Sequence, residues 1–106
     1  MLNRELSLIS LAMKAGKVLS GEFMVDKGIK EGQVLLCIVA EDASDNTKKK
    51  FSNMCAYRSV ELIELTNKEL LGNTIGKKYR ATLGITDEGF KDGILKLHRG
   101  VTMNDS

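Results

Sequence analysis

Two lysines beside a glycine turn are the first residues in the chain whose types and spacing could bind a ligand. Lys14 and Lys17 lie on either side of a glycine, shortly before a Ser20–Gly21 turn that can begin a helix. Free backbone amides at the start of a helix bind anions, and nearby lysines strengthen that attraction. The group predicts an anion site, although lysines of this kind more often belong to ordinary solvated surface.

A second basic group surrounds an aromatic residue. Lys77, Lys78 and Arg80 crowd around Tyr79 in a loop that precedes a predicted strand. An aromatic ring in a basic loop can stack on an unpaired base while the charges contact phosphate. Taken alone, this group is also more typical of solvated surface. The residues by themselves therefore predict an anion or RNA surface and leave its ligand open.

The sequence offers little for catalysis or metal binding. His98 is the only histidine and has no serine or cysteine partner within its segment, so we interpret it as a cation at a helix C-terminus. The acidic pairs at 41–42 and 87–88 each follow a strand, where carboxylates can bind metal but more often cap helices. Cys37 and Cys55 lack CxxC spacing, which favours inert core thiols. We expect no catalytic residues, no metal and no cofactor, and a protein that is not an enzyme.

Length and composition limit the class of protein. The 106 residues are 42% hydrophobic and 28% charged, with a net charge of +2. We expect one domain over residues 1–99 and a flexible tail over residues 100–106. Because the net charge is small, any nucleic-acid affinity must come from local clustering. No apolar stretch is long enough for a membrane span and the N-terminus lacks a secretory pattern, so we expect a cytoplasmic protein without a membrane partner, acting as a monomer.

Alternating helices and strands must position these residues. The uninterrupted apolar run over residues 34–40 predicts a strand that is covered on both faces. Residues 17–20 are predicted as a strand end or an extended loop. A further strand is predicted at 60–65, and residues 81–86 alternate like a half-buried strand. Helices are predicted over 3–14, with Leu6, Ile9, Leu11 and Met13 near the spacing of one apolar helix face, and from Gly21 to Gly32, with Phe23, one of Met24 and Val25, and Ile29 inward. Further helices are predicted over 44–57, over 68–73, and after a cap at Thr86 or Asp87. This order predicts an α/β fold, a three-layer α/β/α sandwich.

Six short segments occur in a characteristic order: Leu11–Glu22, Val39–Ser44, Asn46–Lys50, Leu71–Gly72, Ile75–Lys77 and Leu83–Phe90. Together they resemble the bacterial YlxQ-type members of the kink-turn-binding ribosomal protein family, which includes archaeal L-seven-Ae and eukaryotic L-thirty. The resemblance extends from about Leu6 to Leu95. It implies a four-stranded mixed sheet between helices. It also implies binding to RNA internal loops that bend the duplex sharply next to sheared G·A pairs.

The resemblance also implies which residues contact RNA. The helix that follows the first short strand enters the RNA groove in this family, and here that helix starts at Gly21. Where archaeal members carry an Asn-Glu pair, this chain has Phe23 and Met24, and apolar side chains cannot hydrogen-bond to a guanine edge. The loop before the last strand contacts an extruded nucleotide. The expected RNA-binding residues are Lys14, Lys17, Ser20, Gly21, Glu22, Lys27, Glu41, Asp42, Gly76, Lys78, Tyr79 and Arg80.

The sequence thus predicts a non-enzymatic, ribosome-associated protein that binds structured RNA of the kink-turn type, with ribosomal RNA as one candidate. The Gly21 helix start and both basic groups are expected to form one continuous surface, because neither group alone carries enough charge. The alternative is a protein-interaction or assembly module on the same fold that uses the Gly21 and Gly76 edges. RNA binding through lysines weakens steeply as salt rises, whereas a mainly apolar protein interface does not.

Overall fold

The apolar run that begins at Val34 forms an inner strand of the sheet. In the computed structural model, which describes residues 3–100, every residue of β2 (Leu36–Val39) is buried. β2 pairs in parallel with β3 (Glu61–Glu64) and antiparallel with β4 (Thr82–Ile85), and β4 pairs antiparallel with β1 (Val18–Ser20). The strand order β1-β4-β2-β3 confirms the predicted four-stranded mixed sheet.

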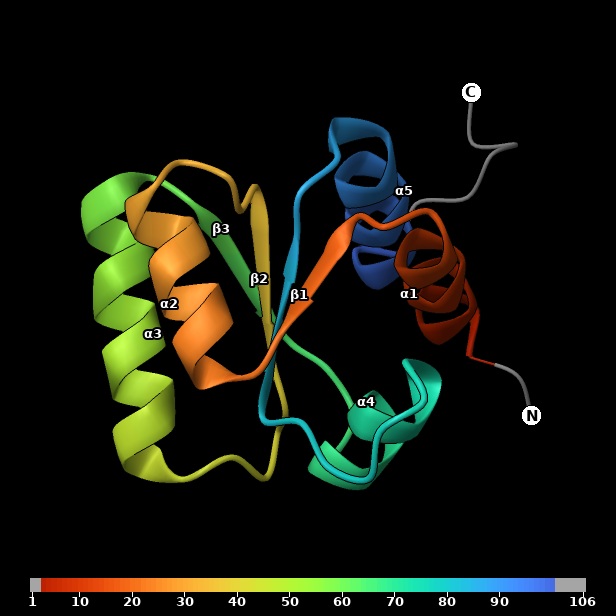
Figure 1. The fold of residues 1–106 in the computed structure, drawn as a ribbon, viewed down its shortest axis with the longest axis horizontal. Coiled ribbons are helices and arrows are strands. Elements are labelled where there is room, and N and C mark those ends of the chain that lie inside the picture. Colours follow the sequence, from red (N-terminus) through yellow and green to blue (C-terminus); the bar gives the residue numbers. More distant parts are fainter. Residues whose placement is uncertain (1–2, 101–106) are drawn as a thin grey trace.

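Helices cover both faces of this sheet. One face carries α2 (Glu22–Lys30) and α3 (Asp45–Arg58), and the other carries α1 (Arg4–Lys14), α4 (Lys68–Thr74) and α5 (Glu88–His98) (Figure 1). The predicted three-layer α/β/α sandwich is therefore confirmed. The core contains apolar residues from all three layers, and its largest fully buried side chains include Phe51, Ile9, Ile29, Leu36, Ile38, Leu71, Leu83, Ile85 and Ile94.

Four of the helices begin at a polar residue whose side chain caps the first turn. Asn3, Ser44, Asn67 and Asp87 each accept a hydrogen bond from the backbone amide three residues later. Such side chains satisfy amides that have no partner within the helix. The caps at Asn3, Ser44 and Asn67 confirm the predicted helix starts, and the last helix uses Asp87, one of its two predicted caps.

Two expectations about burial are wrong. Residues 82–85 of β4 are all buried, because β4 lies between β1 and β2 and has helices over both faces. The small residues Thr82 and Gly84 made this strand look half-exposed. In α1 the buried residues are Ile9 and Ala12, whereas Leu11 remains 53% exposed because it lies on a different side of the helix.

The structure describes the chain as far as Gly100, just after the end of α5. The tail expected over residues 100–106 lies outside the described residues, apart from Gly100. Within residues 3–100, no helix combines the length and the apolar character needed to cross a membrane.

Candidate nucleic-acid interface

Several loops meet at one end of the sheet because β4 runs antiparallel to its neighbours. The chain leaves β1 and β2 at the end where it enters β4, so the turn at Gly21, the loop 40–44 and the loop 76–81 lie together. The Gly21 amide donates to the Thr82 carbonyl over 3.1 Å, and the Ala40 amide donates to the Ala81 carbonyl over 2.9 Å. We call this group of three loops the Gly21 end of the sheet.

Gly21 has a backbone conformation that favours glycine. Its φ of 91° and ψ of 155° lie in a region that is nearly closed to residues with a Cβ atom. A Cβ added there would meet no heavy atom within 4 Å, so the space beside Gly21 is open. Gly21 precedes α2 and supplies no side-chain cap. Within residues 3–100, the first amides of α2 therefore have no capping side chain, the arrangement that attracts anions.

Glu22, the first residue of α2, is held by the start of α3. Its Oε2 atom accepts a hydrogen bond from the Thr47 hydroxyl over 3.1 Å. The Thr47 hydroxyl also accepts from the Ser44 hydroxyl over 2.9 Å. Thr47 is buried and joins the two helix starts. This contact directs the Glu22 carboxylate toward α3, so its orientation is fixed by the protein itself.

The loop over residues 76–81 is fixed by close backbone packing. Gly76 has a φ of 78° and ends the turn after α4. The Lys77 amide donates to the Gly72 carbonyl over 2.8 Å. A Cβ on Gly72 would lie 2.7 Å from the Lys78 carbonyl carbon and 2.7 Å from the Tyr79 nitrogen. The loop therefore lies directly against α4, where only a glycine leaves room.

The Arg80 side chain of this loop contacts the end of β1. The Arg80 Nε atom donates to the Ser20 hydroxyl over 3.4 Å, and its Nη1 atom donates to the Tyr79 carbonyl over 2.6 Å. The Tyr79 side chain is 59% exposed and Lys78 is exposed. The structure thus brings together Ser20, Gly21, Tyr79 and Arg80, as the sequence predicts.

The acidic turn after β2 supports α4. Asp42 Oδ1 accepts a hydrogen bond from the Lys68 amide over 2.8 Å, and therefore caps the first turn of α4 from another loop. The Glu41 amide donates to the Thr66 carbonyl over 2.7 Å, and the Glu41 side chain is exposed. Both residues lie at the Gly21 end, where Asp42 caps α4 and the Glu41 side chain faces solvent.

The outer side of α2 exposes two apolar side chains, Phe23 and Met24. Phe23 is 75% exposed and Met24 is 42% exposed, while Val25 and Ile29 are the apolar residues that pack inward. The expectation that Phe23 is buried is therefore wrong, because the helix turns the side with Val25 and Ile29 toward the sheet. Lys27, one turn after Phe23, is also exposed.

Lys14 and Lys17 lie elsewhere. Lys17 immediately precedes β1, and its carbonyl accepts from the Thr86 amide over 3.0 Å, just after the end of β4. That position is at the opposite end of β1 from Ser20, and we call it the Lys17 end of the sheet. The expected single continuous surface is therefore wrong for Lys14 and Lys17, since antiparallel strands start at opposite ends.

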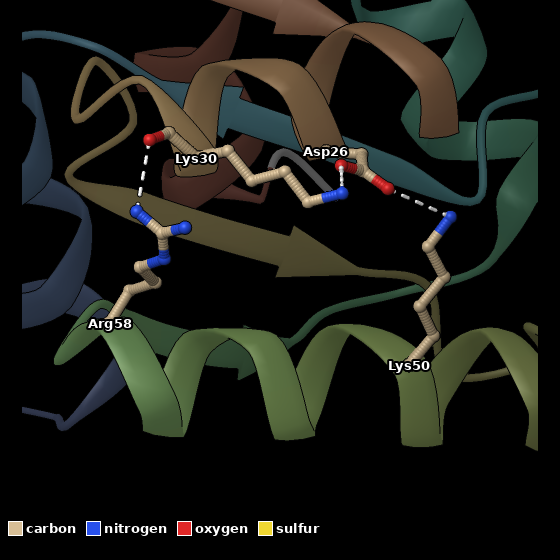
Figure 2. Close-up of polar contacts among 4 residues, drawn as sticks. All are labelled: Asp26, Lys30, Lys50 and Arg58. Atoms are coloured by element: carbon tan, nitrogen blue, oxygen red, sulfur yellow. Dashed lines mark hydrogen bonds and ion pairs between the residues drawn. The ribbon is translucent and has the colours of Figure 1, made fainter.

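The cations at the Gly21 end are free of ion pairs within residues 3–100. Lys27, Lys78 and Arg80 pair with no carboxylate there, whereas Asp26 contacts Lys30 over 2.9 Å and Lys50 over 3.1 Å (Figure 2). Hydrogen bonds from Lys30 and then Lys50 hold the pKa of Asp26 below its ordinary value. Positive charge therefore remains available around the turn at Gly21.

Metal-binding and nucleophilic groups are sparse in the described chain. Residues 3–100 contain no group of three or more His, Cys, Asp or Glu side chains placed to hold a metal ion. Cys37 and Cys55 are free, buried thiols. A hydrogen bond with Cys55, together with burial, raises the pKa of the Cys37 thiol, so it stays protonated. His98, the last residue of α5, has its Nδ1 atom 3.4 Å from the Oε2 atom of Glu5.

Two residues that shape the site, Gly72 and Thr47, were not among the residues predicted to bind RNA. Gly72 leaves room for the loop 76–81, and Thr47 orients Glu22. A glycine inside a helix costs about 1 kcal/mol compared with alanine, so Gly72 already indicated a position with a packing reason. No comparable sequence signal marked Thr47, because its hydrogen bond to Glu22 joins two helices that are far apart in sequence.

Comparisons with known proteins agree with this architecture. Residues 5–94 match the sequence model of the ribosomal protein L7Ae/L30e/S12e/Gadd45 family. The chain is 39% identical over 90 residues to the RNA-binding protein YlxQ of Bacillus subtilis, covering 85% of this chain and 90% of that one. It is 37% identical over 97 residues to the RNA-binding protein YlxQ of Enterococcus faecium, covering 92% and 93%.

A solved structure shows the same fold. A Bacillus halodurans protein described as having unknown function superimposes with a TM-score of 0.85 and 38% sequence identity, covering 88% of this chain and 94% of that one. The family match extends over most of the chain and includes every element at the Gly21 end. This protein therefore belongs to the ribosomal protein L7Ae/L30e/S12e/Gadd45 family.

Proposed function

We propose that this protein binds structured RNA through the Gly21 end of its sheet, at internal loops of the kink-turn type. Its Bacillus subtilis and Enterococcus faecium relatives are both named RNA-binding proteins. The family description includes ribosomal proteins, which makes ribosomal RNA one candidate target. In this role the protein acts without catalysis, as a cytoplasmic RNA-binding component.

The observation that carries the proposal is the coincidence of three features at one end of the sheet. Within residues 3–100, no side chain caps the helix start that follows Gly21, and Lys78 and Arg80 of the neighbouring loop form no ion pair. The exposed ring of Tyr79 lies in the same loop. Helix amides and cations suit phosphate, and an exposed ring suits an unpaired base. An irregular RNA loop offers both groups close together, whereas a regular duplex keeps its bases stacked.

Binding titrations at two salt concentrations test this function. The protein is mixed with a kink-turn RNA and with a duplex of equal length in which the internal loop is fully paired. We expect tighter binding to the kink-turn RNA, and a loss of roughly 30-fold between about 50 mM and about 200 mM salt if three phosphates are contacted. Equal affinity for both RNAs would contradict loop recognition, and no measurable affinity for either would contradict the function itself.

A second candidate, a protein-interaction or assembly module, is favoured by the exposed apolar side chains of Phe23 and Met24. Exposed apolar residues can mark a protein interface. The same titrations separate the two functions, because an apolar protein interface has little dependence on salt. RNA binding that is absent at low salt, together with salt-insensitive capture of a defined protein partner, would favour this second function.

A further inference from the structure

Phe23 is an aromatic residue that the fold does not use. Phe51 is fully buried and Phe90 packs against the core, yet Phe23 is 75% exposed at the first turn of α2. Exposing a large ring forgoes about 1.5–3 kcal/mol of burial energy. The packing of this protein therefore gives no reason for a phenylalanine at this position.

In the described chain, residues 3–100, the surroundings of Phe23 combine its ring with one cation that forms no ion pair, Lys27. A shallow hollow along the outer side of α2 is lined by Phe23, Asp26, Lys27, Lys30 and Glu31. Asp26 is engaged by Lys30 and Lys50, and the close-up shows both contacts (Figure 2). Glu31 lies at the far end of the helix, two turns from Phe23. Lys27 remains as the cation one turn from the ring.

This chemistry suits a nucleotide whose base has left the stack. A base stacks on an aromatic ring whatever its sequence, and a lysine within reach contacts the adjoining phosphate. Phe23 and Met24 have no side-chain group that can hydrogen-bond to a base edge. Any contribution of these two side chains to recognition must therefore come from stacking and apolar contact.

We propose that Phe23 is a stacking platform for an unpaired RNA base, with Lys27 holding the phosphate next to it. This inference rests on the proposed RNA-binding function and adds its mode of recognition. At the start of α2 the protein selects RNAs with a nucleotide that can be splayed out, and it does so without reading base edges through Phe23 or Met24. Affinity at this position then depends on an aromatic ring and is tolerant of base identity.

A single-tryptophan protein tests the stacking contact directly. The chain has no tryptophan, so Phe23→Trp introduces one reporter at an exposed position. We expect strong quenching of its fluorescence when a kink-turn RNA with an unpaired nucleotide binds. Tyr57→Trp is the matched control: Tyr57 is 84% exposed near the end of α3, away from the start of α2, and should show no quenching.

Affinity measurements complete the test. Phe23→Ala should weaken binding by roughly 5- to 150-fold, the effect of losing one base stack, and should leave the salt dependence unchanged because no charge is lost. Phe23→Tyr should bind like the unmodified chain, whereas Phe23→Leu should behave like Phe23→Ala. Lys27→Ala should instead reduce the slope of log affinity against log salt by about one.

The outcomes separate this inference from the function on which it rests. If the unmodified protein binds no RNA, the proposed function fails. If it binds kink-turn RNA, but Phe23→Trp is not quenched and Phe23→Ala binds normally, only the stacking platform is overturned. Loss of binding to a protein partner in Phe23→Ala, with RNA affinity unchanged, would likewise overturn it and assign the ring to a protein contact.

Discussion

The two ends of the sheet carry similar basic residues but offer very different surfaces. At the Gly21 end, Lys78 and Arg80 lie near a helix start without a side-chain cap and an exposed tyrosine. At the Lys17 end, the lysines precede β1, and the neighbouring backbone groups are joined to the end of β4. Each basic group precedes a strand, and these strands are antiparallel. Strand direction therefore decides which cations can act together.

The largest effect should come from a change between the two ends. Leu36 lies in β2, in the middle layer of the protein, and is fully buried. Leu36→Ala should lower the free energy of unfolding by about 2–5 kcal/mol, because it leaves a cavity in the core. Denaturant titration measures this loss. RNA affinity of the folded fraction should remain unchanged, and a stability change near zero would show that β2 is not central to the core.

A smaller but more selective effect is expected at Gly72. A Cβ there would collide with the backbone of Lys78 and Tyr79, so Gly72→Ala must displace the loop 76–81. We expect a stability loss of about 1–3 kcal/mol and a clear loss of RNA affinity. Gly93→Ala is the control, since its Cβ would meet only the Leu8 Cδ1 atom at 3.1 Å, which can move. Equal behaviour of the two variants would contradict the role of Gly72.

Single charge removals compare the two ends directly. Arg80→Ala should weaken binding to a kink-turn RNA and reduce the slope of log affinity against log salt by about one. Lys17→Ala should change neither quantity, because Lys17 lies at the opposite end of β1. Titrations at several salt concentrations give both slopes. If Lys17→Ala reduces the slope and Arg80→Ala does not, the RNA surface lies at the Lys17 end.

The smallest effect should come from the two ion pairs of Asp26, one within α2 and one that joins α2 to α3. Asp26→Asn removes contacts to Lys30 and Lys50 and should lower the free energy of unfolding by less than about 1 kcal/mol at neutral pH. The pKa of Asp26 is lowered in the folded protein, so its contribution is present above the ordinary value of 3.8 and disappears as pH falls below it. Unfolding curves should therefore converge in acid, and divergence there would contradict this assignment.

Local chemistry allowed much of the fold to be predicted. Asn3, Ser44 and Asn67 mark helix starts because a short polar side chain can accept a hydrogen bond from a free amide of the first turn. The run 34–40 identified an inner strand because an uninterrupted apolar segment requires cover on both faces. β4 was misread, since Gly84 is small to accommodate Val34, whose Cγ2 atom would lie 2.8 Å from an added Cβ, and small residues resemble an exposed face in sequence.

The candidate site depended on information that no short segment contains. The separation of Lys17 from Arg80 follows from the pairing of β1 with β4, which are about sixty residues apart in the chain. The contact between Glu22 and Thr47 likewise requires that α2 and α3 pack side by side. Phenylalanine is usually a buried residue, so the sequence alone predicts that Phe23 is in the core. Only the orientation of α2 shows that it faces solvent.

Amide mapping by NMR tests the central claim most directly. Uniformly ¹⁵N-labelled protein is titrated with a kink-turn RNA while the backbone amide signals are followed. We expect the largest changes at residues 21–24 and 76–81. Residues 14–17 and 32–35 should be nearly unaffected; the latter lie at the Lys17 end, where the Leu35 amide donates to the Ile85 carbonyl over 2.8 Å. Changes concentrated at residues 14–17 and 32–35, with the Gly21 end silent, would contradict the assignment of RNA binding to the Gly21 end.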